Sequence, residues 1–153
     1  MSHRWIVIGL LLLLAGCRSA PKAGGASDAE RAAIRAVIEA DASAAALRNE
    51  APQRIPMARA IARYVDALDA LDLDAATPEF ATAMRTHRDA WAAAVPALEP
   101  YGELSGEMHD VLDQIAEFNT PESRAVQRAI DHVWATWAQV EQAMADAGVA
   151  ASG

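Results

Sequence analysis

The sequence predicts an all-α protein, an antiparallel bundle of four to five helices. No segment alternates between apolar and polar residues with the period of two that a half-buried strand requires. Apolar residues instead recur every three or four positions, which places them on one face of a helix. The chain has 153 residues and contains 38 alanines, a residue that favours helix but buries little area. This length suits one domain, whose core must rest on a small number of larger side chains.

The first helix is expected to begin at Ser27 and to run to about Arg48. Ser27 and Glu30 have the spacing of a capping box, in which each side chain bonds the backbone amide of the other residue. Two prolines within 51–56 then interrupt the pattern, and a second helix follows them. The positions expected to face inward in these two helices are Ile34, Val37, Ile38 and Leu47, and then Ile61, Tyr64, Val65, Leu68 and Leu71.

Two Thr-Pro pairs predict the starts of later helices, because threonine caps a helix N-terminus and proline fits its first position. Thr77-Pro78 starts a third helix, which Pro96 and the turn at 99–102 are expected to end. Thr120-Pro121 starts the last helix, and Gly148 lies where a C-terminal cap belongs. The inward positions are Phe80, Met84, His87, Trp91, Val95 and Leu98, then Leu104, Met108, Val111, Ile115 and Phe118 of a fourth helix, and finally Val126, Ile130, Val133, Trp137, Val140 and Met144.

An apolar run near the N-terminus has the size of a secretory signal rather than of a membrane-spanning helix. Arg4 precedes the run, which extends for ten residues from Trp5 to Leu14, whereas a spanning helix needs about 20. The run ends in Leu14-Ala15-Gly16-Cys17, which resembles the lipobox of bacterial lipoproteins. We therefore interpret the chain as a cleaved signal peptide (1–16), a flexible lipidated tether (17–26), a helical bundle domain (27–148) and a disordered tail (149–153).

The resemblance implies that Cys17 becomes the first residue of the mature chain and is the site of lipid attachment, through a thioether-linked diacylglycerol. Two or three acyl chains hold a protein durably at a membrane, whereas a single chain binds only marginally. Cys17 is followed by Arg18 rather than by the aspartate that retains many such proteins in the inner membrane. The expected location is therefore the outer membrane, facing the periplasm. The alternative is an ordinary secreted protein with one unpaired cysteine, since the chain has no second cysteine.

The charge of the chain excludes one class of partner. Lys and Arg number 13 against 21 Asp and Glu, which gives a formal net charge of −8. Such a surface repels the phosphate backbone of nucleic acid. We therefore expect no nucleic-acid binding.

Two segments of the predicted bundle carry a second resemblance. The stretches YVDALDALDLDAATPEFATAMRTHRDAW and VWATWAQVEQAMADAGV resemble uncharacterised helical proteins of bacteria. This resemblance names no activity, so it adds nothing to the functional interpretation.

His87 is the residue for which the sequence leaves a specific functional role open. It lies on an apolar face one turn before Trp91, so its ring is expected to point into the bundle with a pKa below about 6.5. Such a histidine could be a buried metal or haem ligand; the alternative is a core-edge histidine bonded to a backbone carbonyl or a neighbouring carboxylate. His109 and His132 are expected at the boundaries of their apolar faces. Trp134 either anchors a partner through an exposed indole or fills the bundle beside Ile130.

Familiar metal and catalytic motifs are absent from the sequence. It contains no Glu-x-x-His pair of a bundle di-metal site, no His-Glu-x-x-His, no nucleophile elbow and no phosphate-binding loop. The acidic clusters at 66–74 and 103–117 are expected to be solvated and to attract cations only weakly. We therefore expect no catalytic residues, no metal and no cofactor.

Together these observations favour a membrane-anchored envelope lipoprotein with a non-catalytic interaction or scaffold domain. Its expected partners are the membrane, through the lipid on Cys17, and an envelope protein. The alternative is a helical bundle that binds a small ligand or a metal through His87.

Overall fold

The structure of the protein is a computed structural model that describes residues 25–150. Every regular element in this range is helical: α1 (Asp28–Glu50), α2 (Met57–Asp69), α3 (Pro78–Leu98), α4 (Met108–Glu117) and α5 (Pro121–Asp146), with the 3-10 helices η1 (Ala51–Gln53) and η2 (Glu99–Tyr101). The prediction of an all-α fold is confirmed for these residues. The predicted signal peptide, Cys17 and most of the predicted tether lie outside the described residues.

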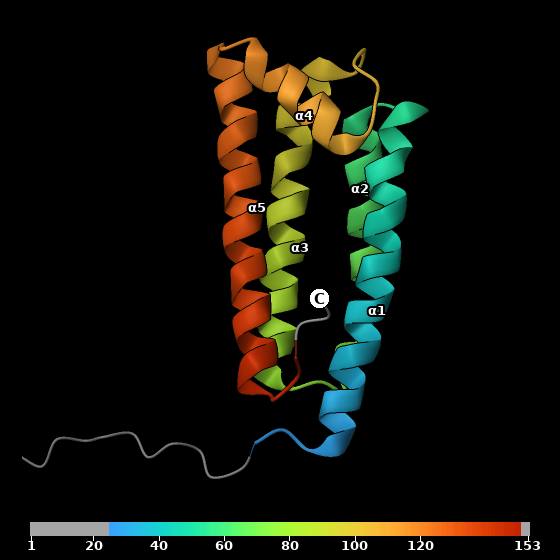
Figure 1. Ribbon diagram of the computed structural model, residues 1–153, viewed down its shortest axis with the longest axis vertical. Coiled ribbons are helices and arrows are strands. Elements are labelled where there is room, and N and C mark those ends of the chain that lie inside the picture. The colour runs from blue at the N-terminus through green and yellow to red at the C-terminus, as the bar shows by residue number, and fades with distance from the viewer. Residues whose placement is uncertain (1–24, 151–153) are drawn as a thin grey trace, which may run out of the picture.

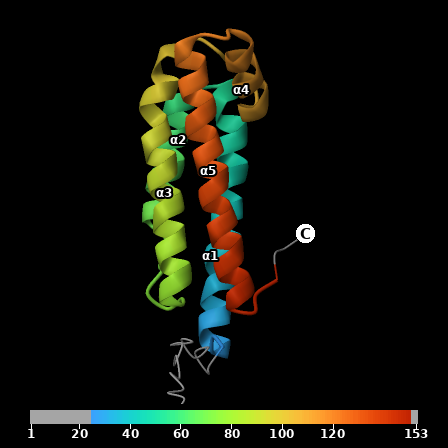
Figure 2. The same ribbon diagram turned by 90° about the vertical axis from the view of Figure 1, so that its left-hand side faces the viewer.

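Four of the helices run along the long axis of the molecule, and α4 lies across one end of them (Figure 1). α1 and α3 run toward the α4 end, whereas α2 and α5 run away from it, as the second view also shows (Figure 2). α3 packs against both α2 and α5, and α2 also packs against α1. This arrangement is compatible with the predicted helical bundle. Within residues 25–150, no helix has both the length and the apolar character needed to span a membrane.

A few large side chains form the core among many alanines. Trp91 and Phe80 of α3 are buried, and the other large side chains buried with them are Ile34, Met57, Ile61, Met84, Leu98, Met108, Val111, Ile115, Val126 and Val133. Four alanines of α3 are buried as well, namely Ala81, Ala83, Ala90 and Ala94. Because alanine is small, it lets α3 approach its neighbours closely while contributing little buried area of its own.

The helix starts that were predicted from capping residues are confirmed. The Ser27 hydroxyl accepts the Glu30 amide at 3.2 Å, and the Glu30 carboxylate accepts the Ser27 amide at 2.6 Å. At the start of α3, the Thr77 hydroxyl accepts from the amide of Phe80. Thr120 caps α5 in the same way, but its reciprocal partner is the hydroxyl of Ser123, so α5 begins with a capping box that the Thr-Pro pair alone did not predict.

The ends of α3 and α5 agree with the sequence, whereas the packed chain extends beyond Gly148. Gly148 has φ +73°, and the amides of Gly148 and Val149 donate to the carbonyls of Ala145 and Met144, which is a Schellman motif. Val149, assigned above to the tail, is only 4% exposed, so the packed chain continues past Gly148. α3 ends at Leu98, directly before the predicted turn at 99–102 and two residues after Pro96. Pro96 lies in the last turn, where its missing amide removes only one intrahelical bond.

The fourth helix is shorter than the apolar spacing predicted. α4 begins at Met108, so Leu104 lies in the preceding loop, where Ser105 and Gly106 disfavour helix. Phe118 follows the last residue of α4, is 53% exposed and stacks on the ring of Tyr101, with 5.9 Å between ring centroids. The inward face of α4 therefore consists of Met108, Val111 and Ile115.

Candidate functional site

A group of polar side chains lies inside the bundle and connects four helices. We call it the polar core, and it consists of Asp41 and Arg48 of α1, Tyr64 of α2, His87 and Trp91 of α3, and Thr136 of α5. Five of these side chains are buried, and Arg48 is half-buried. Buried polar groups are costly unless they are hydrogen-bonded. In the described residues, no buried side-chain nitrogen or oxygen lacks a hydrogen-bond partner.

The first half of the polar core joins α1 to α2 and α3. The Tyr64 hydroxyl donates to the Asp41 carboxylate at 2.5 Å. The guanidinium carbon of Arg48 lies 4.4 Å from the centroid of the Tyr64 ring and 4.5 Å from that of Trp91, and these two rings are nearly perpendicular, at 87°. Both distances fall within the range of cation–π attraction. Arg48 also donates from Nε and Nη2 to the Asn49 side chain.

The second half joins α3 to α5 and specifies the protonation of His87. The indole N–H of Trp91 donates to His87 Nε2 at 3.0 Å, so Nε2 must carry the lone pair. Nδ1 then carries the proton and donates to the Thr136 hydroxyl at 3.0 Å, and that hydroxyl donates to the Val133 carbonyl at 2.7 Å. This chain of bonds is satisfied by the neutral imidazole with its proton on Nδ1.

The pKa values of the polar core follow from burial and from the charge on Arg48. Burial and, to a smaller extent, the positive charge of Arg48 lower the pKa of His87 to about 4, although a hydrogen bond with the Val133 backbone opposes this change. Burial raises the pKa of Asp41, although the Tyr64 hydroxyl and Arg48 oppose that change. Burial also lowers the pKa of Arg48 and raises that of Tyr64. At neutral pH the core therefore contains a neutral imidazole and a protonated phenol.

His87 is buried, whereas two other histidines and Trp134 are exposed, and not all of these positions agree with the predictions. His87 is 3% exposed, as its apolar face predicts, and its two ring nitrogens bond to the side chains of Trp91 and Thr136. His109 and His132 are exposed. Trp134 is 50% exposed and does not fill the bundle beside Ile130.

Trp137, predicted to lie in the core seam of α5, is half-buried at the edge of the core. Its ring lies 5.2 Å from the ring of His87, and its indole N–H donates to Glu141 at 3.1 Å. The Trp137 ring therefore packs against the core, while its indole N–H bonds to a carboxylate at the surface.

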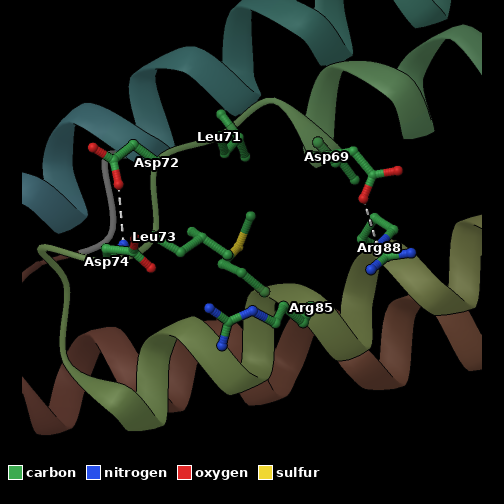
Figure 3. Close-up of a pocket in the computed structure, with 9 residues that line it drawn as sticks. Asp69, Leu71, Asp72, Leu73, Asp74, Arg85 and Arg88 are labelled. Atoms are coloured by element: carbon green, nitrogen blue, oxygen red, sulfur yellow. Dashed lines mark hydrogen bonds and ion pairs between the residues drawn. The ribbon is translucent and has the colours of Figure 1, made fainter.

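Three of the four aspartates of the acidic cluster predicted at 66–74, namely Asp69, Asp72 and Asp74, line a pocket of about 260 Å³ under the loop between α2 and α3 (Figure 3). Asp69 pairs with Arg88 at 3.1 Å, and Asp72 accepts the amide of Asp74 at 3.1 Å. Arg85 and Arg88 both line the pocket from the α3 side, opposite the loop (Figure 3). The carboxylates at 103–117 are exposed. Across residues 25–150, no three His, Cys, Asp or Glu side chains are grouped so that they could hold a metal ion.

A pocket of about 420 Å³ lies between the C-terminal half of α1 and the adjoining face of α2, and we call it the α1–α2 pocket. Three arginines line it, Arg48, Arg54 and Arg63, together with one carboxylate, Glu50. The rest of its lining consists of Ala44, Leu47, Ala51, Ile55, Ala60, Tyr64 and Ala67. The pocket therefore combines an apolar surface with a local excess of positive charge. It shares Arg48 and Tyr64 with the polar core.

Sequence reasoning found His87 but missed Asp41, Arg48 and Thr136. A signal was present in the spacing. Steps of three, four and seven residues separate Ile34, Val37, Asp41 and Arg48, so all four lie on one face of α1. Thr136 likewise lies between Val133 and Val140 at steps of three and four. A polar residue within an apolar series predicts a buried polar contact, and its partner can be identified only in three dimensions.

No protein-family model matches the chain, and no curated protein or solved structure matches it significantly. The polar core and the α1–α2 pocket are therefore interpreted from their own geometry.

The pKa of His87 predicts how stability depends on pH. The unfolded chain binds this proton with a pKa near 6.5 and the folded chain with a pKa of about 4, so protonation favours unfolding in that window. The contribution of His87 is complete above pH 6.5 and is lost as the pH falls to about 4, by roughly 3 kcal/mol. Denaturation of the full chain should show a smaller loss of stability between pH 7 and pH 4 for His87→Gln than for the wild type.

His109→Gln is the matched control, because His109 is exposed and should leave the wild-type pH dependence unchanged. The pKa of Asp41 is raised in the folded chain, so its protonation stabilises the fold as the pH falls, opposite to the effect of His87. Asp41 is present in the wild type and in both variants, so its effect does not change the comparison between them. An equal loss of stability in the wild type and His87→Gln would contradict the assignment.

Removal of the Tyr64 hydroxyl tests the bond between α1 and α2. Tyr64→Phe leaves the buried Asp41 without its donor and should lower the free energy of unfolding by about 1–3 kcal/mol at neutral pH. In an Asp41→Asn background the same change should cost less, because the ionised acceptor is gone. Tyr101→Phe, at a half-buried ring stacked on Phe118, should change stability by less than about 0.5 kcal/mol. Equal effects at the two tyrosines, measured by urea denaturation, would refute a specific role of the Asp41 bond.

Proposed function

We propose that this chain is a lipid-anchored protein of the bacterial cell envelope whose helical domain is a non-catalytic binding module. The observation that carries the proposal is Leu14-Ala15-Gly16-Cys17 at the end of a ten-residue apolar run. A signal-sized run, small residues and a single cysteine coincide there, as they do in lipoprotein precursors. The residue after the cysteine, Arg18, favours the outer membrane, with the domain facing the periplasm.

The geometry of the domain supports this orientation. The start of α1 and the end of α5 lie at one end of the molecule, and α4 lies at the other (Figure 1). An anchor at Cys17 joins the domain at the start of α1, because only a short Gly- and Pro-containing segment separates the two. The α4 end, with the loops around η1 and η2, would then project away from the membrane and toward partners.

A non-catalytic role is supported by what the titratable side chains already do. Both nitrogens of His87 take part in bonds within the buried polar core, so the ring has no nitrogen free to bind a substrate or a metal without breaking one of them. The alternative of a ligand or metal site at His87 would need that rearrangement. Ligand binding is better supported at the α1–α2 pocket, where three arginines adjoin an apolar surface.

Trp134 supports contact with a protein partner. Its indole is 50% exposed on α5, although a large aromatic side chain gains most by burial. Exposed tryptophans often become the energetic centre of a protein interface. We propose that Trp134 contacts the envelope protein that the domain recognises.

Lipid attachment predicts a simple labelling result. In cells fed an alkyne-labelled fatty acid, the wild-type chain should be labelled and shortened, whereas Cys17→Ala should be unlabelled and remain at precursor length. Ser19→Ala is a matched control two residues away and should be processed like the wild type. Acyl label on the Cys17→Ala chain would remove the basis of the proposed anchor.

The partner contact predicts position-specific crosslinking. A photoreactive phenylalanine analogue at position 134 of the full-length protein should give one dominant envelope-protein adduct in cells. The same analogue at position 132, where His132 is also exposed on α5, should give little or none of that adduct. Identical adduct patterns from both positions would argue against a specific contact at Trp134.

A further inference from the structure

The α1–α2 pocket has the composition of a site for a small anionic amphiphile, and we propose that it binds one. The ligand would place a carboxylate or phosphate among Arg48, Arg54 and Arg63 and a short apolar group against the alanines, Leu47 and Ile55. This inference names a ligand class for the binding role proposed above and rests on that role; only the argument against a membrane surface as ligand uses the anchor at Cys17.

Charge supports an anionic head group. The chain carries a net charge of −8, yet the lining of this pocket contains three arginines and a single glutamate. Arg54 and Arg63 are exposed, and among residues 25–150 neither has a carboxylate within ion-pair distance. Arginine side chains recognise carboxylates and phosphates through paired N–H groups. A local positive site on an acidic protein therefore favours an oxyanion over a cation.

Arg48 is the arginine that is held in place before a ligand arrives. Its guanidinium rests against Tyr64 and Trp91, and Asn49 accepts hydrogen bonds from two of its nitrogens. The nearest buried carboxylate, Asp41, already accepts from Tyr64 and forms no ion pair with Arg48 within 4.0 Å. A fixed cation loses little side-chain entropy when it binds an anion.

The apolar part of the pocket favours a ligand with a tail. Leu47, which was predicted to face inward, is instead 71% exposed, and Ile55, also in the pocket lining, is half-buried. Ala44 and Ala67 have small side chains, which leave open the space that larger residues would fill. Covering these surfaces with an acyl or aryl group would remove them from water, at roughly 25 cal/mol per Å² of apolar area.

Size and position favour a small molecule over a membrane surface. The volume of about 420 Å³ lies within the range of small-molecule sites. Leu47 lies twenty residues after Ser27, or about 30 Å along α1, near the end of the bundle at which α4 lies (Figure 1). An anchor at the start of α1 therefore keeps the pocket away from the head groups of its own membrane.

Octanoate is a suitable probe, because it joins a carboxylate to a short acyl chain and is soluble. The full-length protein would be dialysed against radiolabelled octanoate, in nanodiscs of a zwitterionic phospholipid if it is acylated, with empty nanodiscs as the background, and in buffer alone if it is not. We expect saturable binding of one octanoate per chain. Octanol and inorganic phosphate, which carry only the tail or only the charge, should each compete at least tenfold more weakly than unlabelled octanoate.

Matched variants locate the site. Arg54→Gln combined with Arg63→Gln should weaken octanoate binding at least tenfold, whereas Arg35→Gln combined with Arg59→Gln removes the same charge from exposed positions outside the pocket and should leave binding within twofold. Ala44→Leu should weaken binding by filling the pocket, and Ala46→Leu, at an exposed position outside the lining, should not. Circular dichroism would verify that each variant remains helical.

Three results would overturn the proposal: no saturable binding above the empty nanodiscs, equal losses in the two arginine pairs, or competition by octanol or by phosphate as strong as that by octanoate. These results are independent of the labelling of Cys17. A chain that binds octanoate without being acylated would refute only the anchor, and an acylated chain that fails to bind octanoate would refute only the ligand.

Discussion

The position of the Arg48 guanidinium against the rings of Tyr64 and Trp91 is the interaction on which the interior of this bundle depends. It brings α1, α2 and α3 together at one point, and the bond from Trp91 to His87 and on to Thr136 extends the connection to α5. In an alanine-rich bundle the helices offer few large apolar side chains to define their register. Buried hydrogen bonds define the register of the helices instead, because a shift of one helix would break these bonds and leave buried polar groups without partners.

Arg48 also connects the buried polar core to the α1–α2 pocket at the surface. Arg48 belongs to the polar core through the two rings and to the α1–α2 pocket through its place in the lining. Its positive charge also helps to keep His87 neutral, since a second positive charge nearby would be unfavourable. An anion in the pocket would offset part of that charge. Occupation of the pocket and the protonation of the core are therefore physically coupled through one side chain.

The local part of the fold could be predicted from the sequence. Ser27 with Glu30, Thr77 with Pro78 and Gly148 all lie where their own backbone chemistry specifies, because a cap depends on residues within one turn. Leu104 and Phe118 were predicted less well. In each case a residue near a helix end was assigned from its type or its spacing, while the actual end depends on the packing of the neighbouring loops and on only one or two hydrogen bonds.

For the candidate site as well, local properties could be predicted from the sequence and contacts between helices could not. The inward direction of His87 and its lowered pKa could be predicted, because an apolar helix face and the cost of burying a charge determine both. Its partner on α5 could not, since Thr136 lies 49 residues away and reaches His87 only through the contact between α3 and α5. The sequence by itself determined the helices, their starts and the expectation of a lipid-bearing cysteine. The tertiary structure alone decided that Arg48 lies between two rings, that Trp134 is exposed and that three arginines line one pocket, because such relations depend on how helices pack and not on the residues next to them along the chain.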